Sequence, residues 1–166
     1  MQSNLVPRRR NRSIYGQRAY SRVQRGYKQA GLDVIIDTSI KDCKSAESAI
    51  ESHFYSSNLP DAVLALKNLA TIYACEVFQK LKINVPKKVA LIGFDDFELA
   101  STLRPSISVV RQPTEDVGRI ATELLFDQLM NRRGTRSHGG KAKPQHIKLE
   151  NQLVPRNSCG CKIGTN

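Results

Sequence analysis

The stretch VALIGFDD, residues 89–96, decides the fold of this chain. Four apolar residues lead to Gly93 and Phe94, and two adjacent carboxylates, Asp95 and Asp96, follow at once. An apolar run of this length, closed by a glycine and polar residues, is typical of a strand buried on both faces of a parallel sheet. The two acids then either contact a ligand at the end of that strand or belong to an ordinary capped turn.

The rest of the chain alternates between helical and strand patterns. Helical spacing covers residues 17–31, 45–56, 68–83 and 114–130, with a short helical piece at 97–101. Strand patterns cover 33–37, 61–66, 87–96, 106–112 and 145–155. Ser45 is expected to open the second helix and Thr114 to cap the last long one. This alternation predicts an α/β fold with a parallel sheet flanked by helices on both faces.

Polar side chains follow the apolar runs, at the points where the expected strands end. In a parallel sheet the carboxyl ends of the strands meet at one edge, and ligands bind in the crevice outside them. The mixture of acid, amide and cation there suits a polyhydroxylated ligand, whose hydroxyls both donate and accept hydrogen bonds. The residues at these ends are Asp37, Thr38, Ser39, Lys67, Asn68, Asp95, Asp96, Arg111 and Gln112.

The two adjacent acids are expected to differ in role. The sequence DDFELAS allows Asp96 to cap the short helix that follows, which makes it a structural residue. Asp95 is then the acid that faces a ligand, and Gly93 lets the backbone turn or be approached closely. For Asp95 the ordinary turn remains the alternative, and for Asp96 the alternative is contact with the ligand.

The formal net charge of +11 comes from two short segments. Residues 8–25 carry seven basic side chains and residues 132–143 carry five more, with no acid in either segment, so the rest of the chain is close to neutral. A solvated basic tail and loop explains this distribution, and electrostatic contact with nucleic acid is the alternative.

Several function classes are disfavoured. The four cysteines form no spaced framework, which favours a reduced, cytoplasmic protein without metal or cofactor, and CGC at 159–161 is a weak metal signal. The three histidines lie outside any recognisable catalytic motif, so we expect no enzyme. No apolar run is long enough to span a bilayer, and the first residues carry no apolar signal core, so no membrane association and no secretion are expected.

Longer motifs resemble the C-terminal part of bacterial transcriptional regulators of the LacI/GalR family. VPKKVALIGFDDFELASTLRPSISVVRQPTEDVGRIATELLFDQL (85–129) is similar to the family's run from the strand before GFDD, through QP, to the following helix. LENQLVPRNSCG (149–160), RGYKQAGL (25–32) and PDAVLALKNLATIYACEVFQKLKINVP (60–86) resemble its last strand and two upstream elements. The resemblance covers about residues 17–160.

The resemblance implies a periplasmic-binding-protein-like type I domain. In the family, two α/β lobes enclose a small-molecule effector, here a sugar or sugar derivative, and a separate N-terminal helix-turn-helix binds operator DNA as a homodimer. The implied organisation is a basic tail (1–16), the C-terminal lobe (17–111), the crossover, helix and strand of the first lobe (112–157), and a tail (158–166). A sugar-binding protein of a transport system shares this fold and is the alternative.

The family's effector-binding positions carry over unevenly. Asp95 matches the family's effector-reading aspartate, and Gln112 matches a cleft-lining residue at the lobe crossover. The family's helix arginine falls on Val23, which Arg22 and Arg25 flank. The family's strand-end asparagine falls on Lys67, with Asn68 in the next place. Cys43 stands near the position where the family often has a sugar-stacking aromatic residue.

The chain also lacks the helix-turn-helix and most of the first lobe of the family. We therefore expect a truncated form, in which the apolar face of the helix at 114–130 has lost its usual cover. Val117, Ile120, Leu124 and Leu125 form that face.

Overall fold

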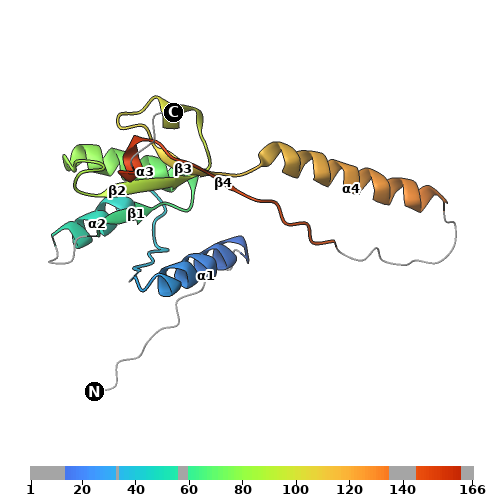
Figure 1. Ribbon diagram of the computed structural model, residues 1–166, viewed down its shortest axis with the longest axis horizontal. Coiled ribbons are helices and arrows are strands. Elements are labelled where there is room, and N and C mark those ends of the chain that lie inside the picture. Colours follow the sequence, from blue (N-terminus) through green and yellow to red (C-terminus); the bar gives the residue numbers. More distant parts are fainter. Residues whose placement is uncertain (1–13, 33, 56–59, 135–144, 162–166) are drawn as a thin grey trace, which may run out of the picture. The chain divides into compact units, whose positions relative to one another are not determined.

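The computed structural model describes residues 14–32, 34–55, 60–134 and 145–161 (Figure 1). The chain divides into two compact units between Ile40 and Lys41. The first unit contains helix α1 (Ile14–Gln29), which is followed by Gly31 with a φ of +66°. Glycine adopts this left-handed conformation without steric cost, so the helix ends where the sequence predicts.

The strand expected at 33–37 is absent from the described residues 34–37, and that prediction is wrong. The apolar run there is not buried, since Ile35 is 59% exposed. At its end the Asp37 carboxylate accepts hydrogen bonds from the backbone N–H and the hydroxyl of Ser39, at 2.7 and 2.6 Å. Such local bonds offer the backbone an alternative to a sheet ladder.

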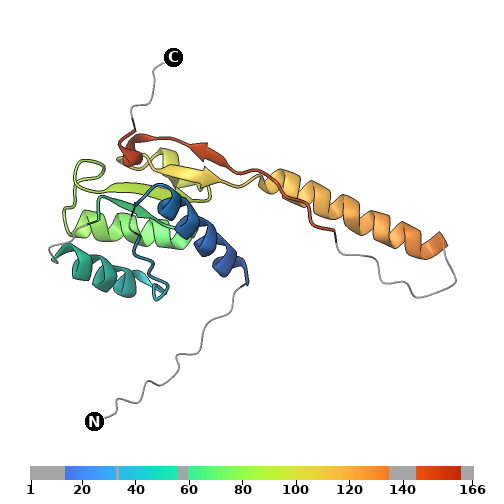
Figure 2. The ribbon, with the colours of Figure 1, turned by 60° about the horizontal axis from the view of Figure 1, so that its bottom comes forward.

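The second unit is built on one four-stranded sheet. Its strands are β1 (Ala62–Leu64), β2 (Ala90–Phe94), β3 (Ser108–Arg111) and β4 (Gln152–Val154), in that spatial order. The first three run parallel, and β4 pairs antiparallel with β3 (Figures 1 and 2). The C-terminal segment therefore returns to the sheet, and β4 covers the edge of β3.

Two helices accompany the sheet in this unit. Helix α3 (Asn68–Lys80) joins β1 to β2 and packs against β2, while α2 (Cys43–Phe54) packs against α3. An ion pair between Lys80 and Glu47 links the two helices. The helices thus cover one face of the sheet, the face against which α3 packs. The helices that the sequence predicts on the other face stay a prediction.

The start of α2 differs from the sequence expectation. Asp42, not Ser45, is the capping residue: its carboxylate accepts from the Ser45 N–H at 2.8 Å, and the Ser45 hydroxyl accepts from the Asp42 N–H at 3.0 Å. Aspartate and serine are both good N-caps. Asp42 begins the helix because its reciprocal hydrogen bonds with Ser45 satisfy the backbone N–H groups of both residues.

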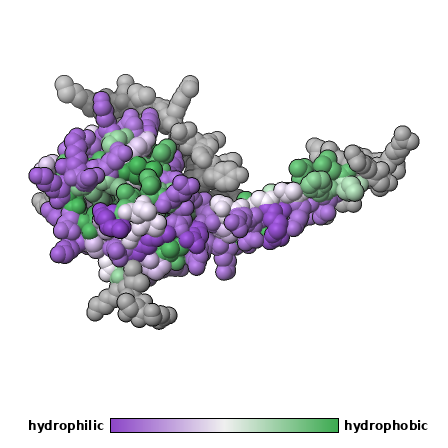
Figure 3. Space-filling model, turned by 90° about the horizontal axis from the view of Figure 1, so that it is seen from above, coloured by the Kyte–Doolittle hydropathy of each residue, from purple (hydrophilic) through white to green (hydrophobic). Residues whose placement is uncertain are grey.

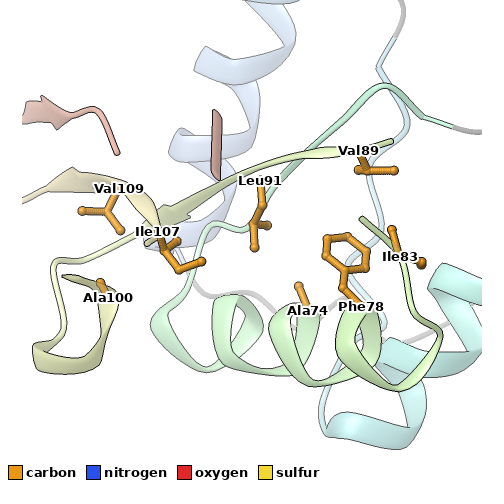
Figure 4. Close-up of a cluster of buried hydrophobic side chains, with 8 residues drawn as sticks. All are labelled: Ala74, Phe78, Ile83, Val89, Leu91, Ala100, Ile107 and Val109. Atoms are coloured by element: carbon orange, nitrogen blue, oxygen red, sulfur yellow. The ribbon is translucent and has the colours of Figure 1, made fainter. Parts of the chain in front are cut away.

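The core lies between α3 and the sheet. Ala74 and Phe78 on α3 face the sheet beneath Leu91 of β2, and Val109 of β3 lies at the other end of the same cluster, all at most 4% exposed (Figure 4). Apolar runs in β2 and β3, not alternating patterns, supply these contacts, as expected for central parallel strands. The remaining members of the cluster are Ile83, Val89, Ala100 and Ile107.

Helix α4 (Thr114–Gly134) follows β3 directly after a Gln112–Pro113 connection. None of the side chains described between residues 114 and 130 is buried. Figure 3 shows apolar side chains near the far end of this helix. The expected exposure of its apolar face is confirmed for Val117 (50%) and Leu125 (56%), while Ile120 and Leu124 are half-buried. None of the helices in the described part of the chain is long and apolar enough to cross a membrane.

Gly93 of β2 is required by a close approach from α3. A Cβ at this position would lie 2.6 Å from Cγ2 and 2.8 Å from Oγ1 of Thr71, which is fully buried. The sequence expectation that Gly93 permits a close backbone approach is therefore confirmed, and the approaching group is a helix side chain.

We expect Gly93→Ala to lower the free energy of unfolding by about 1–3 kcal/mol, because the added methyl overpacks this contact. Urea unfolding followed by circular dichroism measures the effect. The matched control is Gly118→Ala, where a Cβ meets nothing within 4 Å and no loss is expected. Adding Thr71→Ala should recover part of the loss in Gly93→Ala, and a Gly93→Ala variant as stable as wild type would contradict the packing explanation.

Candidate functional site

A hollow of about 470 Å³ lies at the carboxyl ends of β2 and β3. It is open to solvent, and five polar or charged residues line it: Asp95, Asp96, Arg111, Gln112 and Thr114. The first two follow β2, and the others belong to the end of β3 and the start of α4. Four of the nine predicted strand-end residues, Asp95, Asp96, Arg111 and Gln112, therefore gather at one edge of the sheet.

Asp95 adopts an unusual backbone conformation, with a φ of +68°. Its N–H still donates to the carbonyl of Val110 on β3, at 3.0 Å, so the sheet continues into this turn. A left-handed conformation costs a non-glycine residue about 1–2 kcal/mol, and such residues cluster at functional sites. The turn directs Asp95 toward β3, where its carboxylate accepts a hydrogen bond from Nε2 of Gln112.

Asp95 and Gln112 provide the chemistry expected of a polar binding site. A carboxylate has two oxygens and an amide has two N–H groups and a carbonyl, so both keep capacity beyond their mutual hydrogen bond. Asp95 is half-buried and Gln112 is exposed. Together they can accept from and donate to neighbouring hydroxyl groups of a ligand.

Asp96 has a different structural role from the expected helix cap. The residue that caps the 3-10 helix η1 (Glu98–Ser101) is Phe97, and no side chain caps it. The Asp96 carboxylate instead lies between two arginines: it accepts from Nε (2.9 Å) and Nη2 of Arg111, and from Nη2 of Arg156 at 2.8 and 3.0 Å. Two guanidinium groups bind a carboxylate more strongly than an uncharged helix N–H does, which explains why Asp96 pairs with the arginines and does not cap η1.

The environment of Asp96 keeps it ionised. Its side chain is only 13% exposed. Burial opposes ionisation, but the hydrogen bonds and charges of Arg111 and Arg156 outweigh it and hold the pKa of this carboxyl below its usual value.

Arg156 belongs to a C-terminal segment that binds back onto the sheet. We call Arg156 and Ser158 the C-terminal clasp. The Ser158 hydroxyl accepts from the Ser108 N–H at 2.8 Å and donates to the Leu91 carbonyl at 2.6 Å. The Arg156 N–H donates to the Ser108 hydroxyl at 2.8 Å, and its Nη1 donates to the Ile107 carbonyl at 2.7 Å. Ser108 and Ser158 are fully buried, so these bonds satisfy polar groups that have no access to water.

Sequence reasoning did not assign the clasp to the site. The arginine and serine in LVPRNS were used only for the family resemblance. In an extended segment, side chains two positions apart point to the same side. The spacing of Arg156 and Ser158 could therefore have indicated that both side chains face the sheet.

The other predicted site residues do not line the hollow. Lys67 is exposed and precedes α3, where its carbonyl accepts from the N–H and hydroxyl of Thr71 at 3.0 and 3.1 Å. Asn68 begins α3, and its Oδ1 is buried without a hydrogen-bond partner among the described residues. Both lie at the carboxyl end of β1, two strands away from β3. Arg22 and Arg25 are exposed on α1, in the other unit.

The described residues offer no candidate metal centre. No group of three or more His, Cys, Asp or Glu side chains among them is arranged to hold an ion. His138 and seven of the twelve basic residues in the two basic segments lie outside the described residues. The hollow itself is lined by side chains that donate and accept hydrogen bonds, which suits it to recognition of a polar ligand.

The chain is similar to known proteins along most of its length. Residues 6–159 match the family model described as periplasmic binding protein-like domain. The HTH-type transcriptional regulator KdgR of Bacillus subtilis is 27% identical over 159 residues, covering 94% of this chain and 42% of that protein. A solved regulator of the LacI family from Sanguibacter keddieii is 27% identical with a TM-score of 0.71, covering 86% of this chain and 53% of that one.

A second similar structure contains a sugar. It is the transcriptional regulator CelR in complex with cellobiose, 25% identical with a TM-score of 0.70, covering 86% of this chain and 42% of that one. The present chain thus spans about half the length of the proteins it matches.

We expect Asp96→Asn to lower the free energy of unfolding at pH 7 by about 1.5–3 kcal/mol, since it removes hydrogen bonds between charged partners. The folded-state pKa of Asp96 is lowered. Its stabilisation is therefore fully present above the unfolded pKa of about 4 and is lost as the pH falls through the folded value. Urea unfolding at several pH values should find the gap between wild type and variant narrowing below about pH 4.

Asp127→Asn is the matched control, because Asp127 is an exposed acid on α4. It should change the free energy of unfolding by less than about 0.5 kcal/mol at any of these pH values. An Asp96→Asn variant whose deficit stays constant down to the lowest pH would show that the carboxylate charge is not what stabilises the site.

Proposed function

Because the chain belongs to the periplasmic binding protein-like domain family, we propose that it is the effector-binding part of a LacI/GalR-type transcriptional regulator. In this proposal a small molecule binds at the carboxyl ends of β2 and β3. Binding then changes the affinity of the whole protein for DNA, through a helix-turn-helix that lies outside these 166 residues. The coupling is a population shift between two states of the protein.

The observation that carries the proposal is the similarity to regulators along nearly the whole chain. KdgR, the relative that aligns with 94% of the chain, is an HTH-type transcriptional regulator. The LacI-family structure from Sanguibacter keddieii and CelR are also regulators. This favours a regulator over the sugar-binding protein of a transport system, which is the alternative with the same fold.

A sugar or sugar derivative is the effector that the site suits best. CelR was solved in complex with cellobiose, and this chain is similar to CelR over 86% of its length. The Asp95–Gln112 pair supports the assignment, because an acid and an amide together bind adjacent hydroxyls of a sugar ring. Asp96 and Arg111 contribute by holding the edge of the site in place.

Further features follow from the regulator proposal. Operator DNA with two half-sites is read by a dimer, so the working form is a homodimer. The protein acts in the cytoplasm, where its DNA is, and it performs no catalysis and uses no cofactor. Lys67, Asn68, Arg22 and Arg25 remain proposed effector contacts from the resemblance, secondary to Asp95 and Gln112.

Sugar binding by this chain tests the proposal directly. Isothermal titration calorimetry with cellobiose and a panel of monosaccharides should identify a ligand. Asp95→Asn should weaken the binding of that ligand by about tenfold or more, because it removes a charged acceptor from hydrogen bonds worth about 1.5–3 kcal/mol each.

The control is Glu98→Gln, which removes an exposed acid three residues further along the chain. It should leave the dissociation constant within about a factor of two of wild type. Two results would contradict the proposal: no sugar in the panel binds, or the Asp95→Asn variant binds as tightly as wild type.

A further inference from the structure

Two cysteines stand together in the turn that follows the C-terminal clasp. Cys159 ends the 3-10 helix η2 (Asn157–Cys159), and Cys161 follows after Gly160. Gly160 has a φ of +69°, in the left-handed region, so the chain turns sharply between the two thiols. The Cys161 N–H donates to Sγ of Cys159 at 3.3 Å, and the Cys159 thiol itself donates to the Arg156 carbonyl at 3.4 Å.

The spacing permits a disulfide between the two residues. A chain can separate residues two positions apart by at most about 7 Å between Cα atoms, and a turn shortens that distance. Disulfides form at Cα separations of about 4.4–6.8 Å. Cys161 is exposed and Cys159 is partly exposed, so oxidants and reductants can reach the pair.

The two thiols differ in the way that a stepwise oxidation requires. Partial burial opposes ionisation of Cys159, but hydrogen bonds from the Cys161 thiol and the Ser108 hydroxyl outweigh it and lower the pKa of Cys159. The hydrogen bond to Cys159 raises the pKa of Cys161. Cys159 is thus the thiolate that attacks first, and Cys161 is the protonated neighbour that attacks second.

The other two cysteines are held in environments that suppress reaction. Burial raises the pKa of Cys75 to about 11. A hydrogen bond with Glu76 raises the pKa of Cys43. They therefore serve as internal references for the reactivity of an unactivated thiol in the same chain.

We propose that Cys159-Gly160-Cys161 is a site of reversible oxidation by peroxides, which forms a disulfide within the turn. The Cys159 thiolate attacks one oxygen of hydrogen peroxide and breaks the O–O bond, giving a sulfenic acid and hydroxide. The Cys161 thiol then attacks the Cys159 sulfur, forms the S–S bond and releases water, the two protons of the thiols ending in water. A dithiol reductant reverses the reaction by exchange, which suits a chain kept reduced in its resting state.

Mass spectrometry of the intact chain tests this proposal. The protein is treated with an equivalent of hydrogen peroxide, its remaining thiols are alkylated with iodoacetamide, and its peptides are mapped. The peptide with Cys159 and Cys161 should have lost two hydrogens and taken up no label, while Cys43 and Cys75 stay mostly reduced. The chain should remain free of interchain disulfides, and dithiothreitol should restore both thiols.

Single substitutions separate the two steps. Cys161→Ser should stop the reaction at the sulfenic acid of Cys159, which dimedone labels. Cys159→Ser should slow oxidation at residue 161 several-fold, and the double variant Cys43→Ser/Cys75→Ser should behave as wild type. Alkylation of Cys159 should be about tenfold faster than that of Cys43 in the folded chain, and the difference should largely disappear in guanidinium chloride.

Three results would overturn the proposal. The first is equal oxidation of Cys159 and Cys43 in the folded chain. The second is a product linked mainly between chains, and the third is an unchanged rate in Cys159→Ser. The proposal does not depend on sugar binding, so either can fail without the other.

Discussion

The ion pairs of Asp96 hold together the part of the sheet from which the candidate site is built. One carboxylate, 13% exposed, joins Arg111 at the end of β3 to Arg156 in the segment that follows β4. A charge this far from water is stable only when it is paired and hydrogen-bonded, and Asp96 has both arginines. The C-terminal clasp completes the connection, because the buried hydroxyl of Ser158 bridges β2 and β3.

This constraint separates the roles of two neighbouring acids. Asp96 is committed to the two arginines, so it holds the turn in place and is not available to a ligand. Asp95, in its left-handed conformation, has Gln112 as its partner at the rim of the open hollow. Asp96 thus fixes the turn that carries Asp95. A binding site requires such support, because the supporting groups fix the geometry of the residues that contact the ligand.

Most of the fold was predictable from local patterns. The apolar runs of β1, β2 and β3 and the amphipathic spacing of α3 and α4 depend on neighbouring residues, which the sequence displays directly. The run at 33–37 was misleading because three apolar residues form a strand only where a sheet edge receives them. The start of α2 was predicted at 45 and lies at Cys43, because Asp42 and Ser45 are both good caps.

The site was predictable in part. Asp95 and Gln112 were identified from strand ends and from the family resemblance, and the structure brings them into contact. The two arginine partners of Asp96 lie 15 and 60 positions away, so no local pattern contains them, and the nearby helix start was a reasonable but wrong alternative. The difference between the two thiols of CGC likewise depends on a turn and on Ser108, which spacing alone does not reveal.

A double-mutant cycle on Asp96 and Arg156 tests the central claim most directly. Unfolding free energies of wild type, Asp96→Asn, Arg156→Gln and the double variant give the interaction energy between the two side chains, separate from the bond of Arg156 to the Ile107 carbonyl. We expect an interaction energy of about 1–3 kcal/mol at pH 7, typical of residues in one hydrogen-bonded network. Additive losses, within about 0.5 kcal/mol, would contradict the claim that this ion pair holds the site together.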